Sequence, residues 1–65
     1  DDKLDDGLAV QAALVALPPE QREVVHLKLF DGLTLQEIAD LTAESMNTIA
    51  SRYRYALEKL RVLLK

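Results

Sequence analysis

The chain has 65 residues, no cysteine, one histidine and a formal net charge of −3. This length allows one small domain, and the composition argues against disulfide staples and against a zinc site built from cysteine and histidine. No apolar run approaches the roughly 20 residues that span a bilayer, so no membrane partner is expected. The absence of cysteine is compatible with a reducing cytoplasm. Because the chain starts at Asp1, without methionine or a signal-peptide pattern, we expect an excised C-terminal piece of a longer protein.

The apolar periodicity predicts an all-α fold, a compact four-helix domain with helices at about 3–16, 19–30, 35–41 and 46–64. In the first helix, one apolar stripe recurs at helical spacing, and three further residues widen it. The stripe consists of Leu4, Leu8, Ala12 and Val15, and the widening residues are Val10, Leu14 and Leu17. Pro18 ends this helix, and Pro19 suits the first position of the next.

The second helix has an apolar face and ends at a glycine. The face comprises Val24, Val25, Leu27, Leu29 and Phe30. Asp31-Gly32 is expected to end the helix because glycine adopts the left-handed conformation readily. Arg22 is expected to be solvated or to pair with an acid such as Glu20 or Glu23. His26 has no cluster of partners near it in sequence, which favours a boundary role over a ligand role.

Residues 34–55 contain two helices separated by a very short break. Thr34 and Glu37 have the spacing of a capping box, which marks the start of the third helix. Ser45 is a good N-cap for the fourth helix. Only Thr42, Ala43 and Glu44 lie between the two helices. Two helices joined by so short a turn predict a helix-turn-helix, whose second helix can enter the DNA major groove.

The fourth helix is expected to bury one face and to present the other to solvent. The predicted core face is Met46, Ile49, Tyr53, Ala56, Leu57, Leu60 and Leu64. The opposite face begins with amide, hydroxyl and guanidinium groups, which hydrogen-bond base edges and phosphates. Residues 1–47 contain ten acids and three bases, giving −7, whereas residues 48–65 contain five bases and one acid, giving +4. This asymmetry indicates either a polyanion-facing surface or a merely solvated helix.

The order of these motifs resembles region 4 of bacterial RNA polymerase sigma factors, within the sigma-70 family, and especially the extracytoplasmic-function type. The resemblance covers residues 17–61 and is carried by four segments. They are Leu17–Val25, Phe30–Thr34, Gln36–Ala39 and Ser45–Arg52. It implies a four-helix domain that recognises the −35 element of double-stranded promoter DNA through its last helix during transcription initiation. It also implies contact with the β flap of the RNA polymerase core, and capture by an anti-sigma factor.

The resemblance supplies candidate DNA-binding residues only at matching positions. They are Ser45, Asn47, Thr48, Ser51, Arg52, Arg54 and Tyr55. Asn47 and Arg54 are candidates for reading bases, and Ser45, Thr48 and Arg52 are candidates for holding phosphates. The outward face of the helix adds Ser51 and Tyr55 as potential base readers.

Four positions depart from the family pattern. One is Thr42, which replaces a usual large aliphatic residue. Ala43 occupies a turn position that is usually glycine, and Ala50 occupies one that is usually lysine. Glu44 replaces an apolar residue and places a negative charge beside the proposed DNA face. These departures predict weak DNA contact by the isolated domain.

Two functional classes follow from these observations. The first is promoter recognition as part of a sigma factor, and the second is a protein-interaction module that docks polymerase or an anti-sigma factor with weak DNA contact. Another helix-turn-helix regulator, such as a response-regulator output domain, fits the motif order less well. No set of nucleophile, base and orienting group is evident, and no glycine-rich phosphate loop is present, so no enzyme, cofactor, metal or small-molecule substrate is expected.

Overall fold

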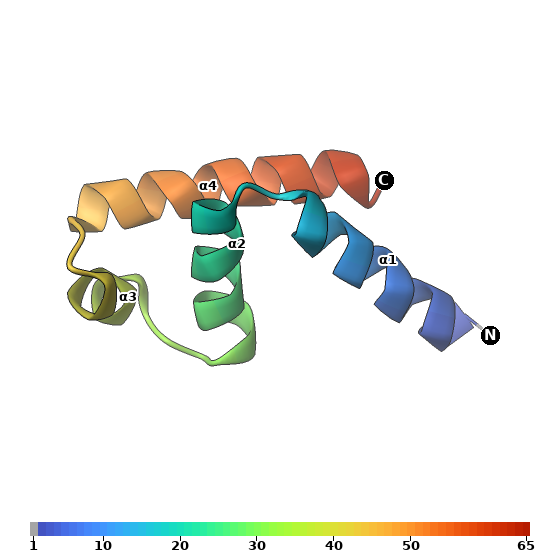
Figure 1. Cartoon of the computed structure of the whole chain (residues 1–65), viewed down its shortest axis with the longest axis horizontal. Coiled ribbons are helices and arrows are strands. Elements are labelled where there is room, and N and C mark those ends of the chain that lie inside the picture. Colours follow the sequence, from blue (N-terminus) through green and yellow to red (C-terminus); the bar gives the residue numbers. More distant parts are fainter. Residues whose placement is uncertain (1) are drawn as a thin grey trace.

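The computed structural model describes the backbone of residues 2–65 and the side chains of residues 7–65. It contains the helices α1 (Asp2–Ala16), α2 (Pro19–Val25), α3 (Leu35–Thr42) and α4 (Met46–Leu63), and a π-helical segment, η1 (His26–Phe30), that continues α2 (Figure 1). No β-strand occurs over residues 2–65. The predicted all-α fold with a C-terminal helix-turn-helix is therefore confirmed.

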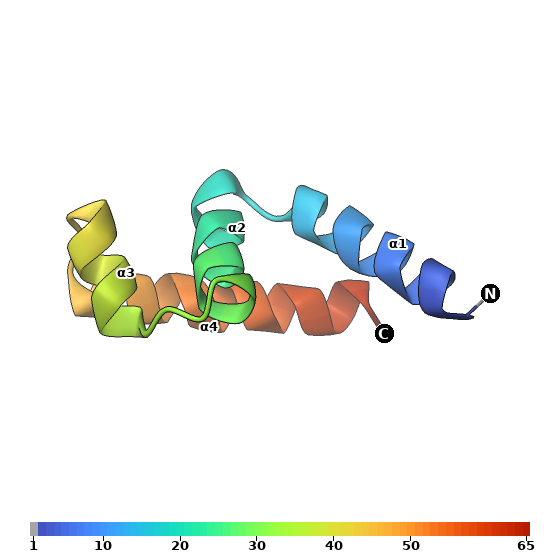
Figure 2. The same ribbon diagram turned by 90° about the horizontal axis from the view of Figure 1, so that it is seen from below.

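Helix α4 is the long element on which the others assemble. Helices α2 and α3 pack against it, whereas α1 makes few contacts with it and runs obliquely away from it in the view of Figure 1. Figures 1 and 2 both place α3 beside the N-terminal turns of α4 and α1 toward its C-terminal end. The molecule is consequently elongated, with principal extents of 40 × 20 × 14 Å. The N-terminal half of α4, beside α3, lies at the opposite end of the molecule from α1.

Two apolar clusters hold the helices together. The first joins the C-terminal part of α1 to α2 and the distal half of α4; its buried members are Ala13, Leu14, Leu17, Val25, Ala56 and Leu60. The second joins α2, α3 and the first turns of α4; its buried members are Val24, Ile38, Ala39 and Ile49. Tyr53 packs against both clusters. The side of α4 that faces these clusters is therefore committed to packing, and the other side remains available.

The buried face of α1 differs from the predicted stripe. Leu8 and Val15 are 60% and 67% exposed, whereas Leu14 and Leu17, which were predicted to widen the stripe, are buried. The predicted contribution of Leu4 lies outside the described side chains. The stripe prediction was wrong at Leu8, Ala12 and Val15 and correct at Leu14 and Leu17. The C-terminal part of α1 is the part that packs on the first cluster, and the partner surface there selects the face that is buried.

The predicted helix over 19–30 is continuous, but its hydrogen bonding changes at His26. The N–H of Asp31 donates to the carbonyl of His26 at 3.2 Å, five residues earlier, which is the π-helical pattern. Gly32 then adopts a φ of 77°, as expected for a glycine that ends a helix. Of the predicted apolar face, Val24 and Val25 are buried, whereas Leu29 and Phe30 are more than half exposed.

The side chain of Arg22 connects α2 to the end of α1. Its guanidinium donates to the carbonyls of Leu14 and Leu17, both at 3.1 Å, and to that of Val15 at 3.4 Å. The last carbonyls of a helix have no partners within the helix, so Arg22 supplies them from the neighbouring element. Arg22 is exposed, as expected, but its partners are these carbonyls rather than Glu20 or Glu23.

The predicted core face of α4 is correct at its centre and too wide at its edges. Ile49, Ala56 and Leu60 are buried, and Tyr53 is half-buried. The other three residues of the prediction, Met46, Leu57 and Leu64, are exposed. Helices α2 and α3 cover only the middle of the arc, and α1 covers little of the distal half.

Candidate nucleic-acid interface

The first helix of the helix-turn-helix is fixed at its start by the predicted capping box. The hydroxyl of Thr34 accepts a hydrogen bond from the N–H of Glu37 at 3.0 Å, and the Glu37 carboxylate accepts one from the N–H of Thr34 at 2.8 Å. Two N–H groups that the helix leaves without partners are thus satisfied. The orientation of α3 on the second cluster is completed by Ile38, which is fully buried.

The turn between α3 and α4 depends on a left-handed residue. Ala43 has a φ of 59° and a ψ of 35°, and the N–H of Glu44 donates back to the carbonyl of Ala39 at 3.0 Å. This bond spans five residues, as in a Schellman motif, where glycine is the usual left-handed residue. Alanine costs about 1–2 kcal/mol in that conformation because its Cβ approaches the following carbonyl. The turn is therefore strained, yet it sets the direction in which α4 leaves.

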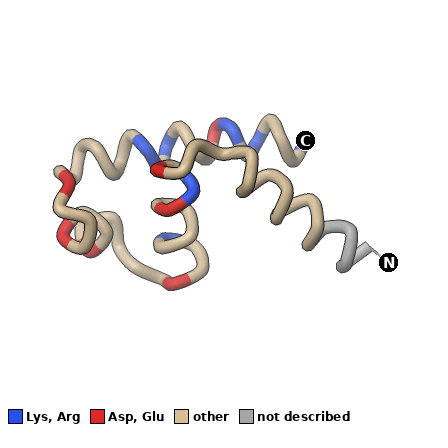
Figure 3. The backbone as a smooth tube through the Cα atoms, in the orientation of Figure 1, with Lys and Arg blue, Asp and Glu red and all other residues tan. Residues whose placement is uncertain are grey.

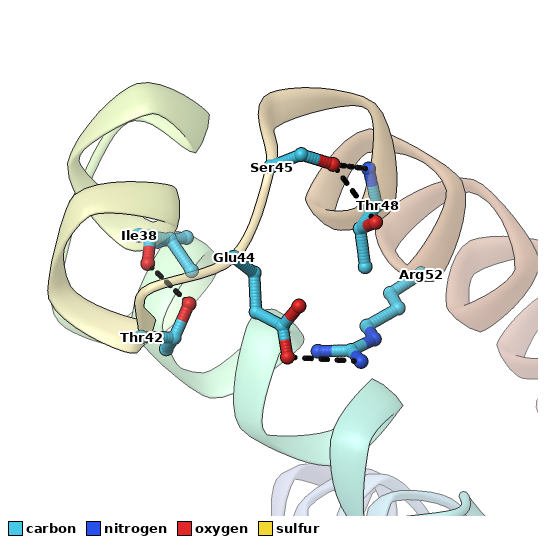
Figure 4. A network of polar contacts seen from close by, with 6 residues as sticks. All are labelled: Ile38, Thr42, Glu44, Ser45, Thr48 and Arg52. Atoms are coloured by element: carbon cyan, nitrogen blue, oxygen red, sulfur yellow. Dashed lines mark hydrogen bonds and ion pairs between the residues drawn. The ribbon is translucent and has the colours of Figure 1, made fainter.

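Ser45 caps α4, as the sequence predicted. Its hydroxyl accepts a hydrogen bond from the N–H of Thr48 at 3.0 Å and donates to the Thr48 hydroxyl at 2.9 Å (Figure 4). Both side chains are thereby tied to the cap, which reduces their freedom to reach a ligand. The N-terminus of α4 nevertheless retains a positive dipole end, and no acidic residue lies in its first turn.

The other candidate residues lie on two adjacent rows of α4, away from the clusters. One row consists of Asn47, Ser51 and Arg54, spaced by one turn each, with Asn47 and Arg54 exposed and Ser51 half-buried. The second row contains Thr48, Arg52 and Tyr55. The fold thus brings amide, hydroxyl, guanidinium and phenol groups onto one solvent-facing side of the first three turns.

Arg52 forms an ion pair that was not predicted from the sequence. Its Nη2 lies 3.4 Å from Oε2 of Glu44, the residue immediately before the N-cap Ser45 (Figure 4). The side chains are 28% and 40% exposed, respectively. The sequence identified each as a charge near the DNA face, but a separation of eight residues across a turn gave no sign that they meet. The Nη2 group of Arg52 is consequently engaged with Glu44.

Arg54 and Tyr55 also contact each other. The guanidinium carbon of Arg54 lies 5.1 Å from the centre of the Tyr55 ring, within the range of a cation–π contact. Both side chains are exposed. Figure 3 shows that lysine and arginine recur along α4, whereas acids predominate around α3 and its turns. The interface that α4 offers is basic and polar, and it is bounded by acidic surface on the α3 side.

The pocket and the second ion pair among the described residues lie on α1, η1 and the turn after it, not on this face of α4. An open pocket of about 280 Å³ lies between α1 and η1, lined by Gln11, Leu14, His26 and Phe30. Nδ1 of His26 lies 3.6 Å from Oδ2 of Asp31, and both groups are exposed. No three potential metal-ligating side chains cluster within the described part of the chain. None of the described helices is both long and apolar enough to cross a bilayer.

Comparison with known proteins gives a consistent match. The family model of sigma-70 region 4 matches residues 13–62. RNA polymerase sigma factor SigV of Bacillus subtilis is 38% identical over 52 residues, which cover 80% of this chain and 31% of that protein. The ECF RNA polymerase sigma factor SigK of Mycolicibacterium vanbaalenii is 39% identical over 60 residues, covering 92% of this chain and 31% of that protein. The chain thus spans about a third of the length of these relatives.

Proposed function

The chain belongs to the sigma-70 region 4 family, and from that premise we propose that it recognises the −35 element of promoter DNA as part of a bacterial sigma factor. The observation that carries the proposal is the polar and basic side of the first three turns of α4, which the helix-turn-helix leaves open to solvent. A helix presented in this way fits the major groove of B-DNA. Its role is binding rather than catalysis.

Asn47 and Arg54 are the residues proposed to read bases. Both are exposed, and they lie seven residues apart on one row of α4, so both can face the same stretch of groove. The amide of asparagine pairs with adenine, and a guanidinium pairs with guanine, each by two hydrogen bonds. Contact of Arg54 with the Tyr55 ring limits the orientations of the guanidinium before binding. Ser51 lies between them and can add a single contact.

Phosphate contacts are proposed for the cap and the second row. The dipole end of α4 and the N–H groups near Ser45 favour an anion at the start of the helix. The Ser45 hydroxyl already donates to the Thr48 hydroxyl. The Thr48 hydroxyl is therefore the group of this pair that can donate a hydrogen bond to a phosphate oxygen. Arg52 contributes its full set of donors only when it leaves Glu44. The small number of bases on this surface is consistent with weak binding by the isolated domain.

A second candidate function is docking of another protein, and exposed apolar side chains favour it. Leu29 and Phe30 of η1 are more than half exposed, and Phe30 lines the pocket beside α1. Exposed apolar side chains that gather in one region mark interaction surfaces. We propose the β flap of RNA polymerase core or an anti-sigma factor as the partner, in the bacterial cytoplasm, with this surface remote from the DNA-reading face of α4.

Selection from a randomised library tests the proposed function. Duplexes with roughly ten randomised base pairs, one turn of DNA, are enriched on the immobilised protein at low salt. The proposal predicts that one motif emerges and that Asn47→Ala or Arg54→Ala relaxes the preference at individual positions. The matched control is Gln11→Ala, which removes an exposed amide from α1. Enrichment of no motif by the parent, with normal helicity by circular dichroism, would contradict base reading by this domain.

A binding measurement separates the docking candidate from the first. Isothermal titration with the RNA polymerase core is predicted to show binding that Phe30→Ala weakens and Arg54→Ala does not. Equal loss from both substitutions would show that the two surfaces are not independent.

A further inference from the structure

The ion pair between Glu44 and Arg52 lies at the boundary of the proposed DNA face, and it has a consequence for binding. Oε2 of Glu44 is 3.4 Å from Nη2 of Arg52, with both side chains partly exposed. A carboxylate and a phosphate offer the guanidinium the same kind of acceptor, an anionic oxygen. One guanidinium cannot give its full set of donors to both. Glu44 therefore engages a donor of Arg52 that a DNA phosphate could also use.

The position of Glu44 is set by the turn rather than by the ion pair. Its backbone N–H is held by the carbonyl of Ala39 at 3.0 Å, and its neighbour Ala43 is fixed in the left-handed conformation. The next residue, Ser45, is fixed by the cap. The main chain on both sides of Glu44 is thus constrained, so the carboxylate stays within one side-chain length of the start of α4 when Arg52 moves away.

We propose that Glu44 is an intramolecular competitor for DNA phosphate that lowers the affinity and the salt dependence of binding through Arg52. This inference rests on the proposed function and adds an affinity-determining residue to it. When DNA approaches, Arg52 exchanges the carboxylate for a phosphate, and the released carboxylate stays near the DNA backbone and repels it. The domain consequently binds weakly by itself and requires additional contacts elsewhere in the full sigma factor and polymerase.

Glu44→Gln tests the proposal because it removes the charge while keeping a side chain of similar size. Binding is measured by fluorescence anisotropy on a labelled mixed-sequence duplex of about 25 bp across a salt series, since phosphate contacts do not depend on sequence. The expected result is an affinity about two- to five-fold higher at low salt, the range of an exposed ion pair. The slope of log K against log salt should steepen by up to about 0.9, the value for one added phosphate contact.

Two further variants make the result specific. In an Arg52→Ala background, Glu44→Gln should lose at least half of its gain, because the competition acts through Arg52. Asp31→Asn changes the net charge equally, in the turn after η1 that lies away from α4 (Figure 1), and should leave the slope unchanged. A gain that persists in full without Arg52, or that Asp31→Asn reproduces, overturns the proposal in favour of general repulsion.

The proposal and the proposed function fail in different ways. If the parent binds DNA and Glu44→Gln binds equally, Glu44 does not compete for Arg52; if Glu44→Gln binds more weakly, Glu44 positions Arg52. Either result overturns only the present inference. If neither the parent nor Glu44→Gln binds the duplex at low salt, the DNA-binding function itself is contradicted. Binding by Glu44→Gln alone would support the competition in its strongest form.

Discussion

Nε of Arg22 donates a hydrogen bond to the carbonyl oxygen of Leu14 at 3.1 Å, so that a side chain of α2 completes the end of α1. The same guanidinium reaches the carbonyl of Leu17. Because α1 touches the rest of the molecule mainly near its C-terminal end, these bonds are expected to decide whether α1 stays docked.

Arg22→Ala is therefore predicted to destabilise the domain by about 1–2 kcal/mol, through the loss of hydrogen bonds from a charged donor. For a domain of this size, each 1 kcal/mol lowers the Tm by about 4–8 °C. Arg22→Lys should recover little, since an ammonium cannot reproduce the fork of the guanidinium. Hydrogen exchange should accelerate in α1 before it does in α3. A Tm of Arg22→Ala equal to that of the parent would show that the bonds to Leu14 and Leu17 do not contribute to the free energy of unfolding.

Truncation of the second cluster should be the most damaging single change in α4. Ile49 is fully buried between α2 and α3, and Ile49→Ala is predicted to cost about 2–5 kcal/mol. Leu57→Ala serves as the control because Leu57 is 37% exposed, and a smaller loss is expected there. Urea denaturation measures both. If Leu57→Ala costs as much as Ile49→Ala, the packing described for α4 is incorrect.

The strain at Ala43 predicts a stabilising substitution. Ala43→Gly removes the Cβ from a residue with a φ of 59° and should stabilise the domain by roughly 0.5–1 kcal/mol, after allowing for the greater freedom of glycine in the unfolded chain. Ala12→Gly in the exposed part of α1 is the control and should destabilise by about 1 kcal/mol. A lower Tm for Ala43→Gly than for the parent would contradict a left-handed turn.

The helix caps and the glycine that ends the second helix were predictable from the sequence. The capping box of Thr34 and Glu37, the cap at Ser45 and the left-handed Gly32 all appear as predicted, because each depends on residues within a few positions of one another. The order of such signals was also enough to indicate the fold and the family. A residue's own neighbours determine these features, so no knowledge of tertiary packing was needed.

Contacts across turns and between helices were not predictable in this way. The Arg22 side chain reaches α1 across the two prolines, and the Glu44–Arg52 pair forms across the start of α4. Each of these depends on how one helix lies against the next. The exposure of Val15 was likewise not predictable. The periodicity of α1 indicates which residues share a face, but it does not indicate which part of that face another helix covers. The assignments of individual DNA-binding residues remain predictions.

The most direct test of the account is the affinity of Arg54→Ala for the duplex selected by the parent, measured by anisotropy at low salt beside Lys65→Ala. Lys65 lies eleven residues further along the chain and carries the same charge, so general electrostatic effects should be similar in the two variants. If α4 reads DNA through Arg54, that variant loses about 1–3 kcal/mol of discrimination against a mutated site, and Lys65→Ala keeps the parent's preference. Equal discrimination by Arg54→Ala, Lys65→Ala and the parent would contradict the central claim.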